Sequence, residues 1–277
     1  MPISAHPDQA GTDKAPASRL GILLLGETIE ADDLAEALKD RAGCHLLRDR
    51  DATVAADLAT TEVFADTLRT RAIRLVIDAT NPYDLAMSDR ALTAAVAADR
   101  PILRLMRPAW QRDPLDAWID VTSVAAAADI CRWYGKRILL TLGESDLSPF
   151  GGNDRCHFIV RLPAKPASPL DLRHHDLIIG QGPFAWIDER RLMMEEKVDL
   201  LVSRNIGGLD SYAKVDVARD LAIPVVMISR PVPPFQPSVE TVAQALTWID
   251  AWQQSETDQM LISRRTGDQK ATSADTE

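Results

Sequence analysis

The sequence predicts an α/β protein with two similar halves, because short apolar runs alternate with helical patterns and this alternation starts twice. The first series opens with the apolar run Gly21–Leu25, and the second opens with Arg137–Leu142. Strands that alternate with helices build parallel sheets whose faces are covered by the helices. We therefore expect two parallel sheets, with the boundary between the two domains near Gly135.

The individual elements follow from the length and period of each apolar pattern. Runs of three to six apolar residues predict buried strands, and apolar residues spaced three or four apart predict helices. The predicted strands are Gly21–Leu25, His45–Leu47, Leu75–Asp78, Ile102–Leu105, Arg137–Leu142, His157–Leu162, Leu177–Ile179, Leu200–Val202 and Val225–Ile228. The predicted helices are Ile29–Leu38, Val54–Arg71, Leu85–Ala98, Val124–Tyr134, Ile187–Glu196, Tyr212–Leu221 and Val239–Gln253.

The expected domains are 19–135 and 136–254, flanked by polar tails at 1–18 and 255–277 that we expect to be disordered. Hydrophobic residues make up 46% and charged residues 26% of the chain, which is ordinary for a globular protein. The net charge of −10 argues against a nucleic-acid partner. We expect no membrane span, no metal site and a cytoplasmic location, because the apolar runs are short and the three cysteines lie far apart.

Residues 200–214 combine a strand-like run with a polar turn that suits an anion. Gly207 and Gly208 allow a tight turn and a close approach of the backbone to a ligand. The helix that follows offers N–H groups at its positive end, and Arg204 and Lys214 add fixed charge. The stretch fits a phosphate or carboxylate site, but it also fits an ordinary strand-to-helix loop whose glycines provide clearance.

Two loops of the first half also follow strands, which is where ligands bind in open parallel sheets. Gly26 and Thr28 precede a helix and suit a phosphate, although Thr28 also fits a helix N-cap. Thr80 and Asn81 can form hydrogen bonds to a ligand, although Asn81 also fits a turn that caps the next helix. Both loops are therefore candidate parts of a binding site.

Arginines recur at or near the ends of strands in a chain of net charge −10. They are Arg104, Arg107, Arg161, Arg204 and Arg230. Because a guanidinium binds a carboxylate through two parallel hydrogen bonds, we expect a focused basic cleft that holds a polycarboxylate. Charged helix residues such as Glu189 and Arg190 are expected on solvated faces. No Ser-His-Asp or Cys-His set is evident, so we expect a cofactor to supply the chemistry.

Seven segments then occur in an order that is informative as a set. They are G-E-T-I-E (Gly26–Glu30), V-I-D-A-T-N-P-Y (Val76–Tyr83), R-L-M-R-P-A-W (Arg104–Trp110), L-L-T-L-G-E-S-D-L (Leu139–Leu147), G-Q-G-P-F (Gly180–Phe184), S-R-N-I-G-G (203–208) with Lys214, and I-P-V-V-M-I-S-R-P (Ile223–Pro231). In this order they resemble the precorrin-6A reductase family of cobalamin biosynthesis, and the resemblance covers about Leu20 to Arg230.

The resemblance implies two Rossmann-like domains with a cleft between them, and it allows for a strand exchanged between the domains. It implies an NADPH-dependent oxidoreductase that reduces a double bond of the precorrin-6A or cobalt-precorrin-6A macrocycle to give precorrin-6B. The ligand would be a polycarboxylate tetrapyrrole, and we expect a monomer or weak homo-oligomer. The expected NADPH contacts are Gly26, Thr28, Glu30, Arg48, Arg50 and Thr80. The expected substrate contacts are Arg104, Arg204, Asn205, Gly207 and Gly208, and the expected catalytic residues are Lys214, as the proton source, and Asn81.

The chain departs from the family pattern at four positions. Glu27 stands where the family has the second glycine of the first turn, and Asn81 stands where it has a histidine. Arg204 replaces a lysine, and Ile206 replaces a serine. These departures support a second hypothesis, in which the chain is a divergent paralogue that binds a tetrapyrrole or a nucleotide without catalysing a reaction.

Overall fold

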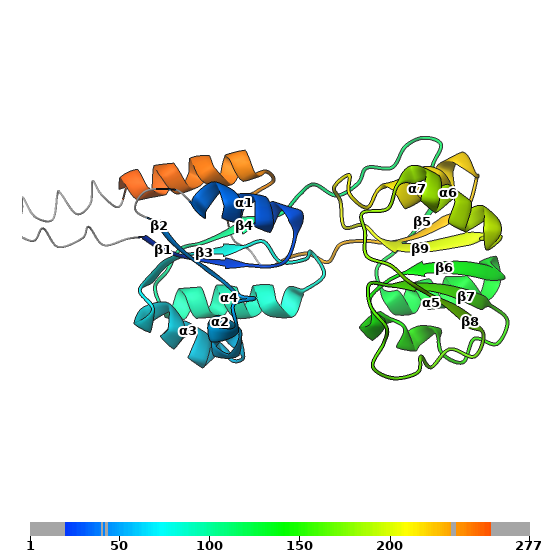
Figure 1. Ribbon diagram of the computed structural model, residues 1–277, viewed down its shortest axis with the longest axis horizontal. Helices are drawn as coiled ribbons and strands as arrows, with labels where there is room; N and C mark the ends of the chain where they lie inside the picture. The colour runs from blue at the N-terminus through cyan, green and yellow to red at the C-terminus, as the bar shows by residue number, and fades with distance from the viewer. Residues whose placement is uncertain (1–19, 40, 42–43, 234–236, 256–277) are drawn as a thin grey trace, which may run out of the picture.

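The computed structural model describes residues 20–39, 41, 44–233 and 237–255. Within these residues, two sheets with parallel strands lie one after the other along the long axis of the molecule (Figure 1). The predicted α/β class and the two parallel-sheet domains are therefore confirmed. The predicted tails fall outside the described residues, except for Ser255, which belongs to a helix that covers 242–255.

The first sheet has the strand order β11-β4-β3-β1-β2. Its strands are β1 (Leu20–Leu25), β2 (Cys44–Arg48), β3 (Ile73–Asp78), β4 (Ile102–Leu105) and β11 (Ser238–Val239). Its helices are α1 (Ile29–Lys39), α2 (Ala52–Ala55), the short 3-10 helix η1 (Ala56–Leu58), α3 (Thr61–Thr70) and α4 (Leu85–Ala97). The helical pattern predicted for Val54–Arg71 is interrupted before Thr60, whose side chain accepts a hydrogen bond from the Val63 N–H and caps α3.

Alternation along β1 builds both sides of the first core. Leu23 and Leu25 pack with α3 and α4, whereas Ile22 and Leu24 pack with α1 and the helix at 242–255. Figure 1 shows these two helices side by side on one face of the sheet and α2–α4 on the other. Successive strand residues point to opposite faces, so a strand covered on both sides must be apolar throughout.

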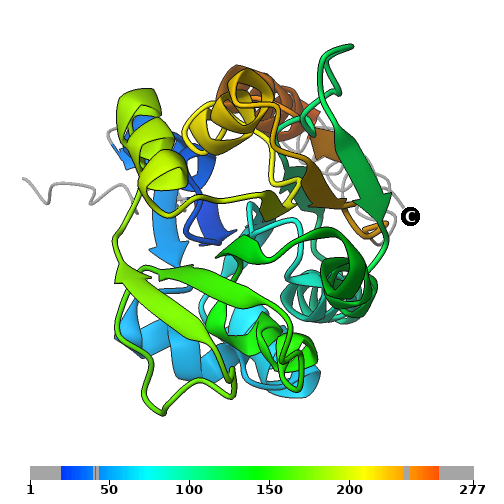
Figure 2. The ribbon, with the colours of Figure 1, turned by 90° about the vertical axis from the view of Figure 1, so that its right-hand side faces the viewer.

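The second sheet has the strand order β5-β10-β9-β6-β7-β8. Its strands are β5 (Trp118–Val121), β6 (Arg137–Thr141), β7 (His157–Leu162), β8 (His175–Ile179), β9 (Leu200–Arg204) and β10 (Val225–Ile228). Its helices are α5 (Val124–Tyr134), α6 (Trp186–Glu195) and α7 (Ala213–Asp220), with 3-10 turns η2 (Glu144–Asp146) and η3 (Ser148–Phe150). Figure 2 views the molecule along its long axis, with this domain in front of the first.

The predicted domain boundaries, 19–135 and 136–254, are wrong at both ends. β5 and α5 precede residue 136 but belong to the second sheet, because β5 pairs with β10. β11 and the helix at 242–255 follow the second sheet in the chain but belong to the first domain, because β11 pairs with β4 and Ile249 packs in the first core. The chain therefore crosses between the domains twice. Sequence order suggested one crossing because β5 and β11 are too short to stand out as apolar runs.

The first crossing is held by hydrogen bonds to the loop after β9. Arg230 donates hydrogen bonds to the carbonyls of Arg107 (2.7 Å) and Pro108 (3.2 Å) on the crossing segment. The same guanidinium donates to the carbonyls of Asn205 (2.7 Å) and Ile206 (2.6 Å) on the loop. We call residues 107–110, 205–208 and Arg230 the crossover clamp.

Asn205 and the glycines complete the crossover clamp. The Asn205 amide accepts a hydrogen bond from the Trp110 N–H (2.7 Å) and donates one to the Trp110 carbonyl (3.0 Å). The Trp110 indole N–H donates to the Gly208 carbonyl (2.6 Å). Gly207 has a φ of 72°, and a Cβ there would lie 2.1 Å from the Pro108 carbonyl oxygen. The glycine is therefore required by the close approach of the crossing segment.

Two further side chains, one on the crossing segment and one in the first domain, also reach across the junction. Arg107 pairs with Glu30 on α1 (2.7 Å) and with Asp210 in the loop after β9 (2.5 Å). The Tyr83 hydroxyl donates to the Ile228 carbonyl (2.6 Å), and the Arg204 guanidinium lies 4.6 Å from the centre of the Tyr83 ring. Burial raises the pKa of Tyr83 to about 12, so this phenol stays protonated as a donor. The two domains are thus joined by charged, polar and aromatic contacts.

Substitution of Gly207 tests the close approach. Gly207→Ala should lower the free energy of unfolding by about 3 kcal/mol or more, because it adds a steric clash to the cost of a positive φ. Gly152 provides a matched control, since its φ is 73° and no atom lies within 4 Å of an added Cβ. Gly152→Ala should cost about 1 kcal/mol. Equal losses in urea unfolding would contradict the account of the crossover clamp.

Candidate functional site

A cavity of about 590 Å³ lies between the two domains. Its walls are the segments that follow β1 and β3 in the first domain and β6, β7, β8 and β9 in the second. In the first sheet the strand order reverses between β1 and β3, and in the second it reverses between β6 and β9. Ligands of open α/β sheets bind at these reversals, beyond the carboxyl ends of the strands. The crossover clamp therefore sits beside a cavity that both reversals line.

Lys214 and Asn81, the two residues predicted to be catalytic, both line this cavity. They come from different domains, since Asn81 follows β3 and Lys214 lies in the first turn of α7. Glu27 and Ile206 line it as well, so three of the four departures from the family pattern border the cavity. The structure thus brings the predicted catalytic pair together at one site.

Asn81 has a structural role in addition to its place in the cavity. Its side-chain oxygen accepts a hydrogen bond from the Tyr83 N–H (3.0 Å), and its carbonyl accepts one from the Asp84 N–H (2.9 Å). Asp84 in turn caps α4 through the Met87 N–H. The turn predicted from the sequence is present, and the exposed side-chain amide of Asn81 borders the cavity.

Lys214 is a buried amine with a lowered pKa. The residue is 6% exposed, and its ammonium donates a hydrogen bond to the Ser211 carbonyl (2.7 Å) and lies 5.2 Å from the centre of the Trp110 ring. Burial is the main cause that lowers its pKa to about 8, and Arg161 adds to the shift, whereas Glu189 and Asp210 oppose it. An amine with this pKa can exchange a proton near neutral pH.

Arg161 and Glu189 form a buried ion pair on the second-domain wall. The Arg161 guanidinium donates to the Glu189 carboxylate (2.8 Å), and the residues are 9% and 3% exposed. Arg161 also lies 4.1 Å from the centre of the Phe184 ring. The expectation that Glu189 lies on a solvated helix face is wrong, because this position of α6 faces β7. Glu189 lies among other charged residues in the sequence of α6, and that pattern does not indicate that its side chain is buried.

The prediction of a focused basic cleft lined by the strand-end arginines is also wrong. Two of the cavity-lining residues are cationic, Arg161 and Lys214, whereas Glu27, Glu189 and Asp210 are anionic. Of the five arginines at or near strand ends, Arg161 is the one that lines the cavity. Arg107 and Arg230 bind carboxylates and carbonyls at the domain junction, so their guanidinium groups are not available to a ligand in the cavity. Positive charge is confined to the second-domain wall.

Arg104 is buried in the first domain, contrary to its predicted role in substrate binding. It is 1% exposed, and its guanidinium donates to Asp78 (2.5 Å) and to the Ser88 hydroxyl (2.5 Å). Thr80, a predicted cofactor contact, belongs to the same network through Asp78 (2.7 Å) and Ser88 (3.1 Å). These groups fasten the end of β3 to α4, so neither Arg104 nor Thr80 is presented to the cavity.

The remaining predicted substrate contacts are also occupied within the protein. Arg204 donates to Asp146 (2.7 Å) and stacks on Tyr83. Asn205, Gly207 and Gly208 belong to the crossover clamp, and the cavity wall does not include them. The glycines of this loop allow the close approach of a neighbouring chain segment. Two adjacent glycines after a strand are equally compatible with the close approach of a ligand, so the sequence did not separate the two cases.

The first turn is built by contacts within the protein. Gly26 has a φ of 104°, its N–H donates to Asp49 (2.7 Å), and a Cβ there would lie 2.2 Å from the Ala79 carbonyl oxygen. The Thr28 hydroxyl accepts from the Ala31 N–H (3.2 Å), which makes it the cap of α1. Glu30 pairs with Arg107. The capping alternative predicted for Thr28 is therefore present.

Arg48 and Arg50 differ in what they can offer to a ligand. Arg48 is 6% exposed and donates to the Gly26 carbonyl (2.8 Å) and to Asp32 (3.1 Å), so it braces the first turn. The Arg50 side chain is 50% exposed and pairs with Asp32 (3.2 Å). Both line a hollow of about 570 Å³ between α1 and β2. Arg50 is the one whose charge is accessible.

The first turn fits the phosphates of a dinucleotide through its backbone. Within the described chain, the N–H groups of Glu27, Thr28 and Ile29 have no hydrogen-bond partner. They lie at the positive end of α1, which favours an anion. The exposed Glu27 carboxylate opposes that attraction, and the nearby Arg50 adds to it. The donor set therefore fits a phosphate group, with the unfavourable charges of Glu27 and Asp49 beside it.

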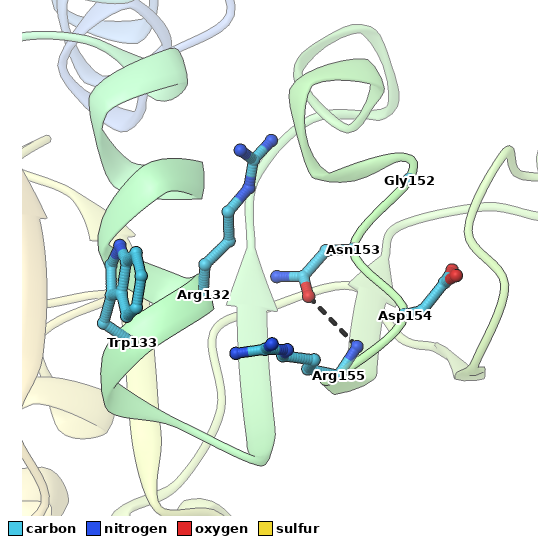
Figure 3. A pocket seen from close by; sticks show the side chains of 6 residues that line it. All are labelled: Arg132, Trp133, Gly152, Asn153, Asp154 and Arg155. Atoms are coloured by element: carbon cyan, nitrogen blue, oxygen red, sulfur yellow. Dashed lines mark hydrogen bonds between the residues drawn. The ribbon is translucent and has the colours of Figure 1, made fainter.

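A separate hollow of about 400 Å³ lies at the opposite edge of the second sheet (Figure 3). It is formed by Arg132 and Trp133 at the end of α5 and by residues 152–155, which precede β7. Because it adjoins the amino-terminal edge of the sheet, it is distinct from the cavity between the domains. Within the described residues, no cluster of metal-ligating side chains is found, and no helix is long and apolar enough to span a membrane.

The comparisons with known proteins agree with this arrangement. Residues 21–250 match the family model described as Precorrin-6x reductase CbiJ/CobK. The chain is 35% identical to a precorrin-6A reductase of Rhodococcus erythropolis, over 82% of this chain and 96% of the relative. It is 30% identical to a precorrin-6A reductase of a Sinorhizobium species, over 87% and 96%.

A solved structure of a CobK precorrin-6A reductase matches with a TM-score of 0.76 at 27% identity, over 84% of this chain and 97% of that chain. The match therefore includes most of both domains and the crossings between them. The family model, the two relatives and this structure agree, and the chain belongs to the precorrin-6x reductase CbiJ/CobK family.

Proposed function

We propose that this protein catalyses the NADPH-dependent reduction of a double bond in the precorrin-6A or cobalt-precorrin-6A macrocycle, which gives precorrin-6B. The observation that carries the proposal is the cavity at the two strand-order reversals, in a chain of this family. Each reversal can take a separate ligand. A cofactor on the first domain and a macrocycle against the second would then meet in the cavity.

The first turn and Arg50 are the proposed cofactor contacts. The N–H groups of residues 27–29 would bind phosphate oxygens, and Arg50 would bind the 2′-phosphate that distinguishes NADPH from NADH. Arg48 and Thr28 would act indirectly, because they shape the turn. When bound, the nicotinamide supplies a hydride, and the protein supplies binding, orientation and the exclusion of water.

Lys214 is the proposed proton donor. Its amine lines the cavity, and its lowered pKa makes it a suitable acid near neutral pH. The hydrogen bond to the Ser211 carbonyl fixes the nitrogen on the cavity wall. Asn81 faces it from the other domain, and its amide could bind a polar group of the macrocycle. Asn81 cannot transfer a proton as the histidine of the family pattern could.

The alternative function is tetrapyrrole or nucleotide binding without catalysis. It is favoured by the exposed Glu27 carboxylate beside the N–H groups that would receive phosphate. A titration of NADPH monitored by its fluorescence separates the two functions. Tetrapyrrole binding without NADPH binding would favour the alternative.

The reductase proposal predicts NADPH oxidation that depends on precorrin-6A. In Arg50→Gln, the KM for NADPH should rise about 10-fold or more, because a charge-assisted hydrogen bond contributes about 1.5–3 kcal/mol. The KM for NADH should change little, since NADH lacks the 2′-phosphate. Arg69→Gln is the control, because Arg69 is similarly exposed on α3. No oxidation at high enzyme concentration would reject the reductase, and an unchanged KM would reject the role of Arg50.

Lys214 predicts a pH dependence. A general acid must be protonated, so kcat/KM should fall as pH rises through about 8, the pKa of Lys214 in the free protein. In Lys214→Gln this dependence should disappear, and kcat should be lower by about 100-fold or more. Stopped-flow rates between pH 6 and pH 10 measure both effects. A variant that melts normally and keeps the wild-type pH profile would assign the proton to another donor.

A further inference from the structure

We infer that Arg161 is a carboxylate anchor for the macrocycle and that Glu189 is the residue that positions it. The inference rests on the proposed function in one respect, which is that the ligand is a tetrapyrrole bearing carboxylates. Arg161 lies at the end of β7, at the carboxyl edge of the second sheet, and its side chain lines the cavity. No other arginine does so within the described residues.

The hydrogen bonds of Arg161 leave one edge of the guanidinium free. Nη1 donates to Glu189, whereas Nε and Nη2 have no hydrogen-bond partner in the described part of the chain. Neither nitrogen is among the buried polar atoms that lack a partner, so both are open to the cavity and available to a ligand. Nε and Nη2 together form the side-on fork that binds a carboxylate through two parallel hydrogen bonds.

Phe184 and Glu189 fix the orientation of that fork. The guanidinium lies 4.1 Å from the centre of the Phe184 ring, an arrangement that favours a planar cation. Glu189 holds Nη1 from α6 and is itself 3% exposed. With one face on an aromatic ring and one nitrogen held by a carboxylate, the guanidinium has little freedom to turn. Pre-organisation of this kind lowers the cost of binding.

Lys214 provides a second cation on the same wall. Arg161 contributes to the lowered pKa of Lys214, which indicates that the two positive charges repel each other. Glu189 and Asp210 are the charged groups that oppose the shift, and Asp210 is itself paired with Arg107. A ligand carboxylate at Arg161 would relieve this repulsion and raise the pKa of Lys214. Binding near pH 8 should therefore take up a proton.

The competing account is that the Arg161–Glu189 pair is purely structural. A buried ion pair can serve only to hold α6 against β7, and its removal would then lower stability without changing affinity. The experiment must therefore measure binding separately from folding and from catalysis. A tetrapyrrole titrated without NADPH meets this requirement.

Uroporphyrin III is the probe, because it carries eight carboxylates and fluoresces. In Arg161→Gln, its dissociation constant should rise about 10- to 100-fold, as expected for the loss of a charge-assisted contact. Arg155→Gln is the matched control, because Arg155 lines the hollow of Figure 3 at the far edge of the same sheet. Its dissociation constant should stay within about twofold of the wild-type value. Arg155→Gln removes the same positive charge as Arg161→Gln, but at a site away from the cavity.

Glu189 is tested by comparing two substitutions. Glu189→Gln keeps an oxygen that can accept from Arg161, so it should bind uroporphyrin III more tightly than Glu189→Ala. Calorimetry at pH 8 in two buffers of different ionisation enthalpy should detect proton uptake by the wild type, and Lys214→Gln should abolish it. A purely structural pair predicts neither result.

Wild-type affinity in a folded Arg161→Gln protein would overturn the inference. If Arg161→Gln does not fold, Arg161→Lys keeps the charge but lacks the fork. Its dissociation constant should still rise several-fold, and an unchanged value would also overturn the inference. Failure of the proposed reductase is distinguishable, because it would abolish NADPH oxidation while leaving this Arg161-dependent binding intact.

Discussion

Four backbone carbonyls that converge on the Arg230 guanidinium determine how the two domains face each other. Two carbonyls belong to the crossing segment and two to the loop after β9, so one cation ties together chain segments about a hundred residues apart. Asn205 repeats the arrangement with the backbone of Trp110. Because the same loop continues into the cavity wall at Ile206 and Lys214, the junction and the site share one piece of backbone.

This arrangement explains how an acidic protein can use many arginines without presenting a basic cleft. Four of the arginines have partners inside the protein. Carboxylates neutralise the charge of Arg104, Arg107 and Arg204, and backbone carbonyls accept the hydrogen bonds of Arg230. Arg161 and Lys214 lie on the second-domain wall together with Glu189 and Asp210, and Glu27 lies on the first. A polycarboxylate would thus be oriented by localised charge, with its anionic groups drawn away from the first domain.

The sequence predicted the α/β class and most strands, because continuous apolar runs have few alternatives in a doubly covered sheet. It failed at β5 and β11, whose identity comes from pairing with β10 and β4. It identified Lys214 and Asn81 as candidate site residues because both lie in segments that follow predicted strands. It could not distinguish glycines that admit a ligand from Gly207 and Gly208, which admit another chain segment, because both need the same backbone freedom. Glu189 gave no signal, since its burial depends on how α6 is docked.

The crossover clamp fixes the two strand-order reversals on either side of one cavity before any ligand binds. The direct measurement is the distribution of distances between spin labels at Val63 on α3 and Met194 on α6, both exposed, in a Cys44→Ser background and without ligand. A fixed junction should give one narrow distribution that broadens in Arg230→Gln and is unchanged in Arg112→Gln, whose partners lie within the second domain. A broad distribution in the unsubstituted protein, or no effect of Arg230→Gln, would contradict it.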